Sequence, residues 1–499
     1  MTTWLPVLPV VAPLLGAGFA TILRHRVRGQ RRLALGAAVV QLAGAIGLLA
    51  VVWRSGPLAL RMGGWPPPFG IVFVADLLGA TMAVITGLIG TAVVVYARAD
   101  ASRRAELDGF YPLYLALLAA VAGAFLTGDL FNLYVWFEVM LAAAIGLLLV
   151  ATRPAQLDGT LKYALLNLIG TTFFLVALSW LYGLTGTLNM ADLHLRVPAV
   201  ENRGAVLTAA MLLVVAFGAK AAVFPLFFWL PASYHTPLAS VSAVFAGLLT
   251  KVGVYALLRV FTLVIDGAGT PIQTVLCWIA GLTMLTGVLG AASQQDIRRI
   301  LSFHIVSQIG YMVLGLALYT PLGIVGSIFY VVHHIIVKAN LFLVSGVVER
   351  LGGGGDLRQL GGLYRRDGVL ATLFAVPAAS LAGLPPLSGF WAKLLLLQAS
   401  LAAGYWALAA TALVVGLLTL FSMTKIWNEA FWKDAPAILP GGRLSSERRR
   451  LLLGPIAALA AVTIAIGLWT QPFLALAERG GATLLDPKPY LDAVREASP

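Results

Sequence analysis

The sequence is poor in charged residues and in cysteine. Only 11% of its 499 residues are charged, whereas soluble domains carry about 25%. Its single cysteine, Cys277, excludes disulfides within the chain and any iron–sulfur or zinc site that this chain alone would ligate through cysteines. The sequence also has no nucleotide-binding fingerprint, no metal-ligand cluster with convincing spacing and no nucleophile paired with a base. These absences argue against an enzyme, and we expect no cofactor.

Long apolar runs dominate what is present. Hydrophobic residues make up 60% of the chain, and the mean hydropathy is +0.91. A helix needs about 20 apolar residues to cross a bilayer, so the runs predict an all-α polytopic membrane protein with about 14 transmembrane helices. The expected spans are residues 4–23, 33–53, 70–96, 111–127, 130–151, 161–182, 205–229, 236–264, 272–291, 300–318, 322–348, 369–400, 405–431 and 451–471.

The basic residues predict the orientation of these spans. The net charge is +13, but the basic residues gather in short loops between apolar runs, so a nucleic-acid partner is not expected. With the N-terminus outward, 21 of the 34 Lys and Arg fall in inward loops, eight lie outward and five lie within spans. Cytoplasmic loops carry such an excess. The pattern predicts a multi-pass protein of a bacterial inner membrane with both termini periplasmic.

Two expected spans contain prolines that should break the helix. Pro225 interrupts the seventh span, and Pro385-Pro386 interrupts the twelfth. Broken spans at matching places in two halves indicate a transporter built from inverted repeats. The prediction divides the chain into N-terminal helices 1–3 (residues 1–110), a first five-helix repeat (111–264), a second repeat (265–431), and helix 14 with a polar tail (432–499).

Isolated charges lie deep inside several spans. Glu138 sits in the apolar run LFNLYVWFEVMLAAAIGLLLV, where a carboxylate costs about 3 kcal/mol on insertion scales. It has no basic neighbour at helical spacing, so an ion-pair partner must come from another helix. Lys220 lies beside the break at Pro225. Burial favours the neutral amine and a nearby carboxylate favours the ammonium, so such a pair can take up and release a proton. The alternative is that Glu138 only holds two helices together.

Further charges extend this line. Lys251 lies at mid-span and could receive a proton from Lys220. His334 and Lys338 are four residues apart and share a helix face, so they could form a relay. Lys393, just after the second break, would be the last member. The weaker candidates are His333, which could simply pack, His304, which could serve as a relay or a helix contact, and Lys425, which could reach the interface. Asp76 and Asp129, near outward span ends, are expected to be interfacial.

Three stretches resemble a known superfamily. FNLYVWFEVML around Glu138, AFGAKAAVFPLFFWLPASYHTPLASVSAVFAGLLTKVGVYALLR and QQDIRRILSFHIVSQIGYMVLGLAL are similar to the proton-translocating antiporter-like membrane subunits. These include the long subunits of respiratory complex I and the large subunits of Mrp-type cation/proton antiporters. The resemblance covers essentially the whole chain and is strongest to the D-type large subunits of the Mrp antiporters. By position, it implies a coupling pair, a central relay and a terminal lysine: Glu138 with Lys220, then Lys251, His334 and Lys338, then Lys393.

The resemblance implies a proton-conducting subunit of a multisubunit Na⁺/H⁺ antiporter, in which the cation could also be Li⁺ or K⁺. Its partners would be other membrane subunits and the lipid bilayer. Two alternatives remain open. The chain could be a proton-pumping subunit of a redox enzyme such as complex I or a membrane-bound hydrogenase. It could also be a structural membrane spacer, in which the deep charges only hold helices together.

Overall fold

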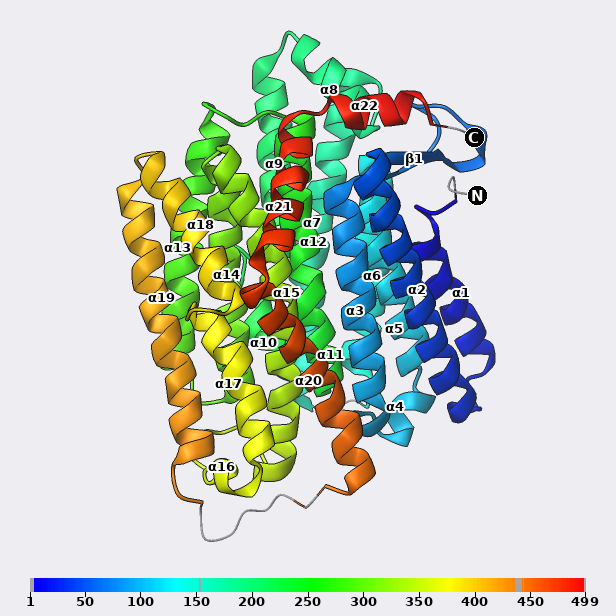
Figure 1. Cartoon of the computed structure of the whole chain (residues 1–499). Helices are drawn as coiled ribbons and strands as arrows, with labels where there is room; N and C mark the ends of the chain where they lie inside the picture. The colour runs from blue at the N-terminus through cyan, green and yellow to red at the C-terminus, as the bar shows by residue number, and fades with distance from the viewer. Residues whose placement is uncertain (1–3, 152–153, 436–441, 443, 498–499) are drawn as a thin grey trace.

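The structure is a computed structural model that describes residues 4–151, 154–435, 442 and 444–497. These residues form a bundle of mostly upright helices (Figure 1). In the described chain, 11 helical segments are long and apolar enough to cross a membrane, and three shorter helices are also apolar. The all-α membrane architecture is therefore confirmed, whereas the count of 14 spans and the inverted repeats stay predictions.

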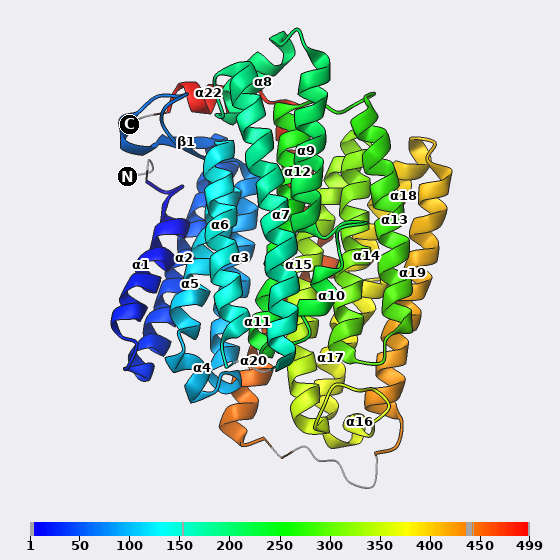
Figure 2. The same ribbon diagram turned by 180° about the vertical axis from the view of Figure 1, so that it is seen from behind.

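The first half of the bundle comes from ten helices. Two of them, α6 and α7, lie at the front in Figure 2, on the face opposite to that of Figure 1. The helices are α1 (Leu8–Ile22), α2 (Val27–Ser55), α3 (Leu77–Asp100), α4 (Arg103–Leu107), α5 (Phe110–Leu126), α6 (Leu130–Leu149), α7 (Pro154–Thr185), α8 (Met190–Arg196), α9 (Arg203–Ala221) and α10 (Trp229–Ser233).

The second half continues from α11 to α22. Its helices are α11 (Ala239–Val244), α12 (Thr250–Arg259), α13 (Pro271–Ser293), α14 (Ile297–Ala317), α15 (Pro321–Gly352), α16 (Leu363–Arg366), α17 (Gly368–Ala382), α18 (Ser388–Ala402), α19 (Trp406–Ile426), α20 (Ser446–Leu468), α21 (Thr470–Leu485) and α22 (Lys488–Arg495).

Both breaks that the prolines predict are present. Helix α9 ends at Ala221 and helical structure resumes with α10 at Trp229, so Pro225 lies in the non-helical segment between them. The backbone of Ala222 has a φ of 62°, which ends the helix. In the second half, α17 ends before Pro385-Pro386 and α18 begins after them, whereas Pro377 stays inside α17.

The eighth expected span is divided in a way that the sequence did not predict. A π-helical turn, η3 (Phe245–Leu249), separates α11 from α12, and a second, η4 (Val260–Val264), follows α12. A third π-helical segment, η5 (Trp427–Trp432), ends α19. Such turns are rare and occur often at functional sites. Lys251 lies two residues after η3.

The segment expected to be a polar tail after helix 14 instead continues as α21 and α22. Helices α20 and α21 run obliquely across α15 and α3, and α22 lies across the upper end of the bundle (Figure 1). The buried side chains of α22 are Tyr490 and Val494. They are four residues apart and therefore share one face. Helix α22 has only eight residues, with charged residues at both ends and in the middle, so it forms no long apolar run that would indicate it in the sequence.

The upper end of the bundle also carries a β-hairpin. Strands β1 (Leu58–Arg61) and β2 (Val72–Ala75) pair antiparallel, and the short turns η1 (Met62–Gly64) and η2 (Val197–Ala199) complete the elements. The expected third span therefore starts late, at α3. There the Asp76 carboxylate accepts a hydrogen bond from the Gly79 amide, 2.8 Å long, and caps the helix.

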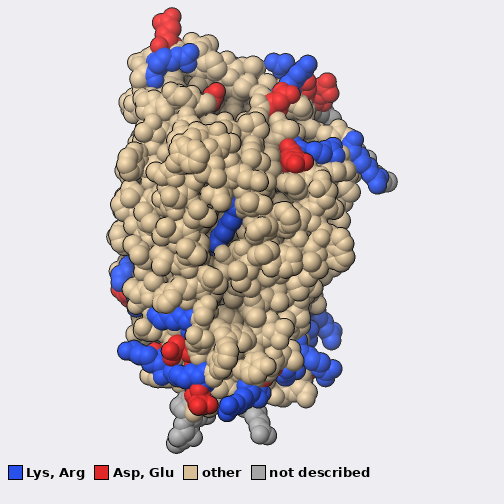
Figure 3. Space-filling model, turned by 60° about the vertical axis from the view of Figure 1, so that its left-hand side comes forward, with Lys and Arg blue, Asp and Glu red and all other residues tan. Residues whose placement is uncertain are grey.

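The charges separate toward the two ends. In Figure 3, Lys and Arg gather mainly at the lower end, and the middle of the surface is almost free of charge. The lower end carries α4 and α16, whereas α1 begins and α22 ends at the upper end (Figure 1). This separation is what a helical bundle in a bilayer requires.

Helix α15 is the axis of the bundle. Its 32 residues run unbroken, and it packs against helices from both halves and from the C-terminal segment: α3, α11, α14, α17, α18, α20 and α21. It also carries three of the predicted site residues, so it holds them at the centre of the molecule: His333, His334 and Lys338.

Candidate functional site: a line of charges inside the bundle

Glu138 and Lys220 lie close together, but they do not form an ion pair. Glu138, on α6, is partly exposed at the side of the bundle, whereas Lys220, in the last turn of α9, is 4% exposed. No N–O distance of 4.0 Å or less joins them in the described structure. The Lys220 ammonium lies 5.6 Å from the ring centroid of Phe137, the neighbour of Glu138.

Lys220 also lacks a hydrogen-bond partner among the described residues. An isolated buried polar group is costly unless it is hydrogen-bonded or changes its charge. The arrangement places the ammonium at the end of a broken helix, where Trp229 Nε1 donates across the break to the Ala219 carbonyl at 3.0 Å. The broken backbone around Lys220 is therefore held in a defined position.

Lys251 is fully buried at the start of α12. Its Nζ donates to the carbonyl of Ala246 within the π-helical turn η3. Helix α12 approaches α9 closely, because a Cβ at Gly253 would lie 2.5 Å from the Ala221 nitrogen. Only glycine permits this contact. It brings the helix of Lys251 against the end of the helix that carries Lys220.

The central group lies between α14 and α15. Lys338 Nζ donates to the Leu301 carbonyl at 3.2 Å. His304 and His334 are fully buried, and neither ring nitrogen of either residue has a partner in the described structure. The group therefore lies where α14 and α15, of the second predicted repeat, pack against α12 and α11, of the first.

His333 has more polar contacts than its neighbour. Its Nδ1 lies 2.8 Å from Ser388 Oγ, and Ser388 Oγ lies 3.0 Å from Ser380 Oγ. The Gly389 amide also donates to Ser380 Oγ at 3.2 Å. The sequence made His333 a weaker candidate that could simply pack, whereas the structure connects it to both sides of the second break. The serines were missed as site residues, although Ser388 follows the proline pair closely.

Lys393 lies beyond this hydroxyl pair. Its Nζ donates to the carbonyl of Ala382, the last residue of α17, at 2.8 Å. The ammonium also lies 5.5 Å from the ring centroid of Tyr311, which stacks on Tyr330 at 5.2 Å. The side chain of Lys393 is partly exposed. Like Glu138, it therefore reaches the side of the bundle.

Lys425 makes the contacts of a helix-capping residue. Its Nζ donates to the carbonyls of Ala292 and Gln294, at 3.2 and 2.7 Å, at the C-terminal end of α13. A cation is favourable there, because the helix dipole places negative partial charge at a C-terminus.

A buried ion pair near the upper end was not expected. Asp76 is 1% exposed and Arg259 is 2% exposed, and Arg259 Nη1 lies 2.6 Å from Asp76 Oδ2. The guanidinium lies 5.3 Å from the ring centroids of both Tyr255 and Tyr490. Asp76 was expected to be interfacial, and the structure adds that its carboxylate is buried and paired with Arg259. Both belong to the packed interior, where α3, α12 and α22 meet.

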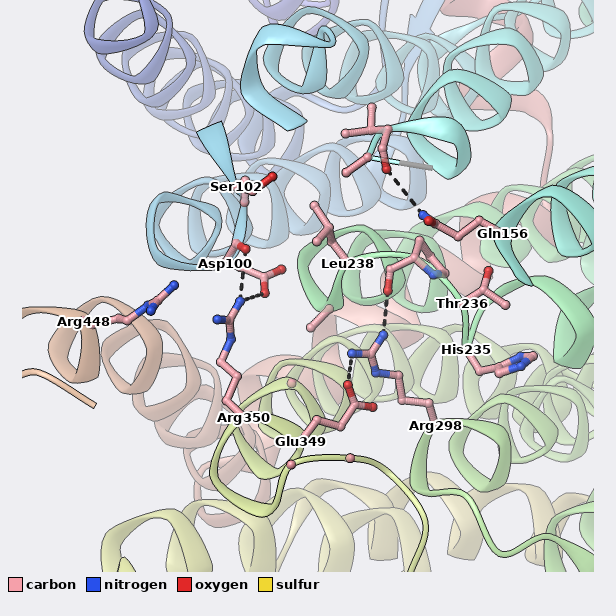
Figure 4. A pocket seen from close by; sticks show the side chains of 18 residues that line it. Asp100, Ser102, Gln156, His235, Thr236, Leu238, Arg298, Glu349, Arg350 and Arg448 are labelled. Carbon is pink, nitrogen blue, oxygen red and sulfur yellow. Dashed lines mark hydrogen bonds and ion pairs between the residues drawn. The ribbon is translucent and has the colours of Figure 1, made fainter. Parts of the chain in front are cut away.

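A cavity of about 570 Å³ opens at the lower end (Figure 4). Two ion pairs cross it: Arg350 to Asp100 at 2.6 Å, and Arg298 to Glu349. Asp100 also accepts hydrogen bonds from the amide and hydroxyl of Ser240, at 2.9 and 2.8 Å. The wall of the cavity is thus tied to the start of α11, the segment that leads to Lys251.

His235 lines the same cavity. Its Nδ1 lies 2.8 Å from the Pro231 carbonyl. Burial lowers the pKa of His235 below its usual 6.5, an effect that the Asp296 carboxylate opposes. Throughout the described part of the chain, no group of three or more His, Cys, Asp or Glu could hold a metal ion.

Known proteins are similar to this chain over most of its length. The family model described as NADH:quinone oxidoreductase/Mrp antiporter, TM, matches residues 127–419. The D subunit of the Na(+)/H(+) antiporter of Alkalihalophilus pseudofirmus is 43% identical over 490 residues, which cover 98% of this chain and 99% of that protein. A chain in the structure of the Mrp complex from Dietzia sp. DQ12-45-1b matches with a TM-score of 0.92 and 36% identity, over 99% of both chains.

A further match is to a respiratory assembly. A chain of the membrane-bound sulfane sulfur reductase, an archaeal respiratory membrane complex, has a TM-score of 0.91 and 26% identity, over 98% of this chain and 99% of that one. The matching region of the family model contains Glu138 and every buried lysine and histidine of the line described above, together with both broken helices. The chain belongs to the NADH:quinone oxidoreductase/Mrp antiporter family of membrane proteins.

Proposed function

We propose that this chain is the proton-conducting subunit of a multisubunit Na⁺/H⁺ antiporter. One observation carries the proposal: a series of basic side chains, buried except for Lys393, runs through the bundle and includes a lysine beside each of the two helix breaks. Ionisable residues inside a membrane bundle are expensive and mark transport pathways. The high similarity to a protein named as the D subunit of a Na⁺/H⁺ antiporter supports the choice of antiport.

The proposed path starts at the lower cavity. A proton taken up there would pass along α11 to Lys251, next to the Glu138–Lys220 pair. Glu138 would act as the switch, because its carboxylate stabilises the Lys220 ammonium when ionised and releases it when protonated. The separation of the two groups leaves room for such a change. Because Lys220 Nζ has no partner among the described residues, water is the hydrogen-bond partner that fits at this step.

From Lys251, the proton would cross α15. His334 would receive it, with Lys338 on the same helix and His304 on the neighbouring α14. His333 contacts Ser388 at the second break. The two adjacent histidines therefore connect different sides of one helix, since consecutive residues point about 100° apart. The hydroxyls of Ser388 and Ser380 would carry the proton toward Lys393. This path uses both predicted repeats, residues 111–264 and 265–431.

Glu138 and Lys393 support assembly with partner subunits. Each is partly exposed at the side of the bundle, and a charge that faces lipid is costly. Other membrane subunits of the complex would cover these two positions. Protons and Na⁺, or alternatively Li⁺ or K⁺, would be the transported ions. The lower, basic end would face the cytoplasm of a bacterial cell, which places both termini on the periplasmic side.

The test is cation-induced collapse of a proton gradient in everted vesicles from an antiporter-deficient host. The chain would be produced with its neighbouring genes, as wild type and as Glu138→Gln. The matched control is Glu447→Gln, which removes the same charge from an exposed position. Na⁺-dependent collapse in the wild type and the control, absent in Glu138→Gln, is expected. Full activity of an assembled Glu138→Gln complex would refute the role of this carboxylate.

A second candidate function is proton pumping in a redox complex. The similarity to a chain of an archaeal respiratory membrane complex favours it. In that case, iron–sulfur or flavin subunits would copurify with the chain, and no alkali cation would collapse the gradient. The buried charges would serve the same proton path, but electron transfer would supply the energy.

A further inference from the structure

A second pocket lies at the lower end, away from the proton path. It has a volume of about 510 Å³, and its lining comes from the turn between α1 and α2, from the start of α2 and from α4. Figure 1 shows α1 and α2 at the edge of the bundle, with α4 beside their lower ends. The lining residues are His25, Arg26, Val27, Arg28, Arg31, Arg103 and Glu106.

The pocket carries an excess of positive charge. Glu106 is its only acidic residue among those described, and its side chain is fully buried. Its carboxylate accepts two hydrogen bonds from Arg31, at 2.6 and 3.0 Å, and a third from the Tyr111 hydroxyl at 3.0 Å. Glu106 therefore forms its ion pair with Arg31 and leaves the other arginines of the pocket without a negative partner among the described residues. The other three arginines form no ion pair within the described chain.

Hydrogen bonds hold the turn between α1 and α2 in place, but no ion pair within the described residues neutralises Arg26 or Arg28. Gln30 Nε2 donates to the carbonyls of Leu23 and Arg24, at 3.3 and 2.8 Å, which holds the connection between α1 and α2. Helix α2 begins after Arg26 with no side-chain cap and no acidic residue in its first turn. Positive side chains are unfavourable at a helix N-terminus. An anion bound in the pocket would compensate both the arginines and the helix dipole.

The surroundings identify the source of the anion. Phe19 and Ile22, on the last turns of α1, are 57% and 77% exposed. They form an apolar, exposed surface on the last turns of α1, just before the turn that lines the basic pocket. A phospholipid has the complementary shape, because its phosphate lies at the interface and its acyl chains lie against the apolar surface. Basic pockets beside membrane helices on the cytoplasmic side bind such headgroups.

We propose that the pocket between the α1–α2 turn and α4 binds the phosphate headgroup of an anionic phospholipid. Arg26, Arg28 and Arg103 contact the phosphate, and the Arg31–Glu106 pair forms the rigid wall. The site holds the peripheral helices α1 and α2 in register with the membrane surface. It does not depend on proton transport, so a failure of the antiport assay leaves it unaffected.

The test is lipid binding to the purified, delipidated complex, measured by native mass spectrometry. The complex would be titrated with phosphatidylglycerol and with phosphatidylcholine of the same acyl chains. Arg26→Gln/Arg28→Gln removes two unpaired charges from the pocket. Each such arginine contributes about a factor of five in affinity near an anionic surface, so we expect binding of one phosphatidylglycerol to weaken about 30-fold.

The matched control is Arg365→Gln/Arg450→Gln, which removes two exposed charges from the same end outside the pocket. It should bind phosphatidylglycerol as the wild type does. Equal binding by the pocket variant and the wild type would overturn the proposal, as would equal wild-type affinity for phosphatidylcholine. Complete displacement of the lipid by excess inorganic phosphate would show that the pocket takes a free anion, and would overturn the assignment to a lipid.

Discussion

The buried pair of Asp76 and Arg259 gives a sharp test of what holds α12, the helix of Lys251, in place. The substitution Asp76→Asn removes the negative charge but keeps an oxygen that can accept from the Gly79 amide, since Asn is as good an N-cap as Asp. Its effect therefore reports the loss of the ion pair and not the loss of the cap. Arg259 is left charged and buried, between the rings of Tyr255 and Tyr490.

The magnitude follows from the burial. Removing one partner of a buried ion pair costs about 3–5 kcal/mol, because the remaining charge is uncompensated. The unfolding entropy is about 2.1 cal/mol/K per residue, which is about 1 kcal/mol/K for a chain of 499 residues. Asp76→Asn should therefore lower Tm by about 3–5 °C. The double variant Asp76→Asn/Arg259→Met leaves no buried charge, and it should be more stable than Arg259→Met alone.

The assay is thermal unfolding of the purified complex, followed by tryptophan fluorescence. The control is Asp486→Asn, an exposed position at the same end, which should leave Tm within about 0.5 °C because surface substitutions are usually small in effect. An unchanged Tm in Asp76→Asn would refute the reasoning. A double variant that is no more stable than Arg259→Met would also refute the reasoning, because the unpaired Asp76 charge in Arg259→Met would then cost no stability.

Three further predictions concern the second break and the lower cavity. Ser388→Ala removes the hydroxyl that lies 2.8 Å from His333 Nδ1. Na⁺-dependent proton flux in vesicles should therefore fall about tenfold, the equivalent of one hydrogen bond, whereas Ser388→Thr keeps a hydroxyl and should retain the flux. Gly389→Ala places a Cβ in collision with the Ser380 carbonyl oxygen of α17, and the yield of folded protein on size-exclusion chromatography should drop, whereas Gly47→Ala, with nothing within 4 Å, should match the wild type. Burial lowers the pKa of His235 in the folded chain below 6.5, so as the pH falls, the imidazole is protonated in the unfolded chain before it is protonated in the folded chain. The stability that the neutral His235 ring contributes is therefore complete above about pH 6.5 and is lost as the pH falls below that value. His235→Asn should therefore reduce the difference in Tm between pH 7.5 and pH 5.5, and an unchanged difference would contradict the burial of this ring.

The sequence predicted those features that depend on one strong local rule. Proline cannot continue a helix, so both breaks were placed correctly at Pro225 and at Pro385-Pro386. A charged residue within an apolar run is easily recognised, so Lys220 and Lys251 were found, and both are buried.

The sequence did not predict features that depend on contacts between distant segments. The pairing of Asp76 with Arg259 joins α3 to α12, and no local pattern indicates it. The π-helical turn before Lys251 depends on packing around one buried span, because hydropathy alone does not distinguish it from an α-helix. The partner of His333 is Ser388, 55 residues away. The two histidines are adjacent in sequence, so their different surroundings become visible only in the folded chain.

Helix α15 has a consequence for how the protein can vary. In the most apolar 18-residue stretch of α15, 94% of the residues are buried inside the protein. In the corresponding stretch of α7, which is equally long, 39% are buried. Interiors are close-packed, so even one added or lost methylene is felt. On α7, many positions face lipid and accept any apolar side chain of roughly suitable size. A library of single substitutions should therefore show its lowest tolerance along α15 at every helical turn, including positions far from the histidines, and a periodic tolerance along α7.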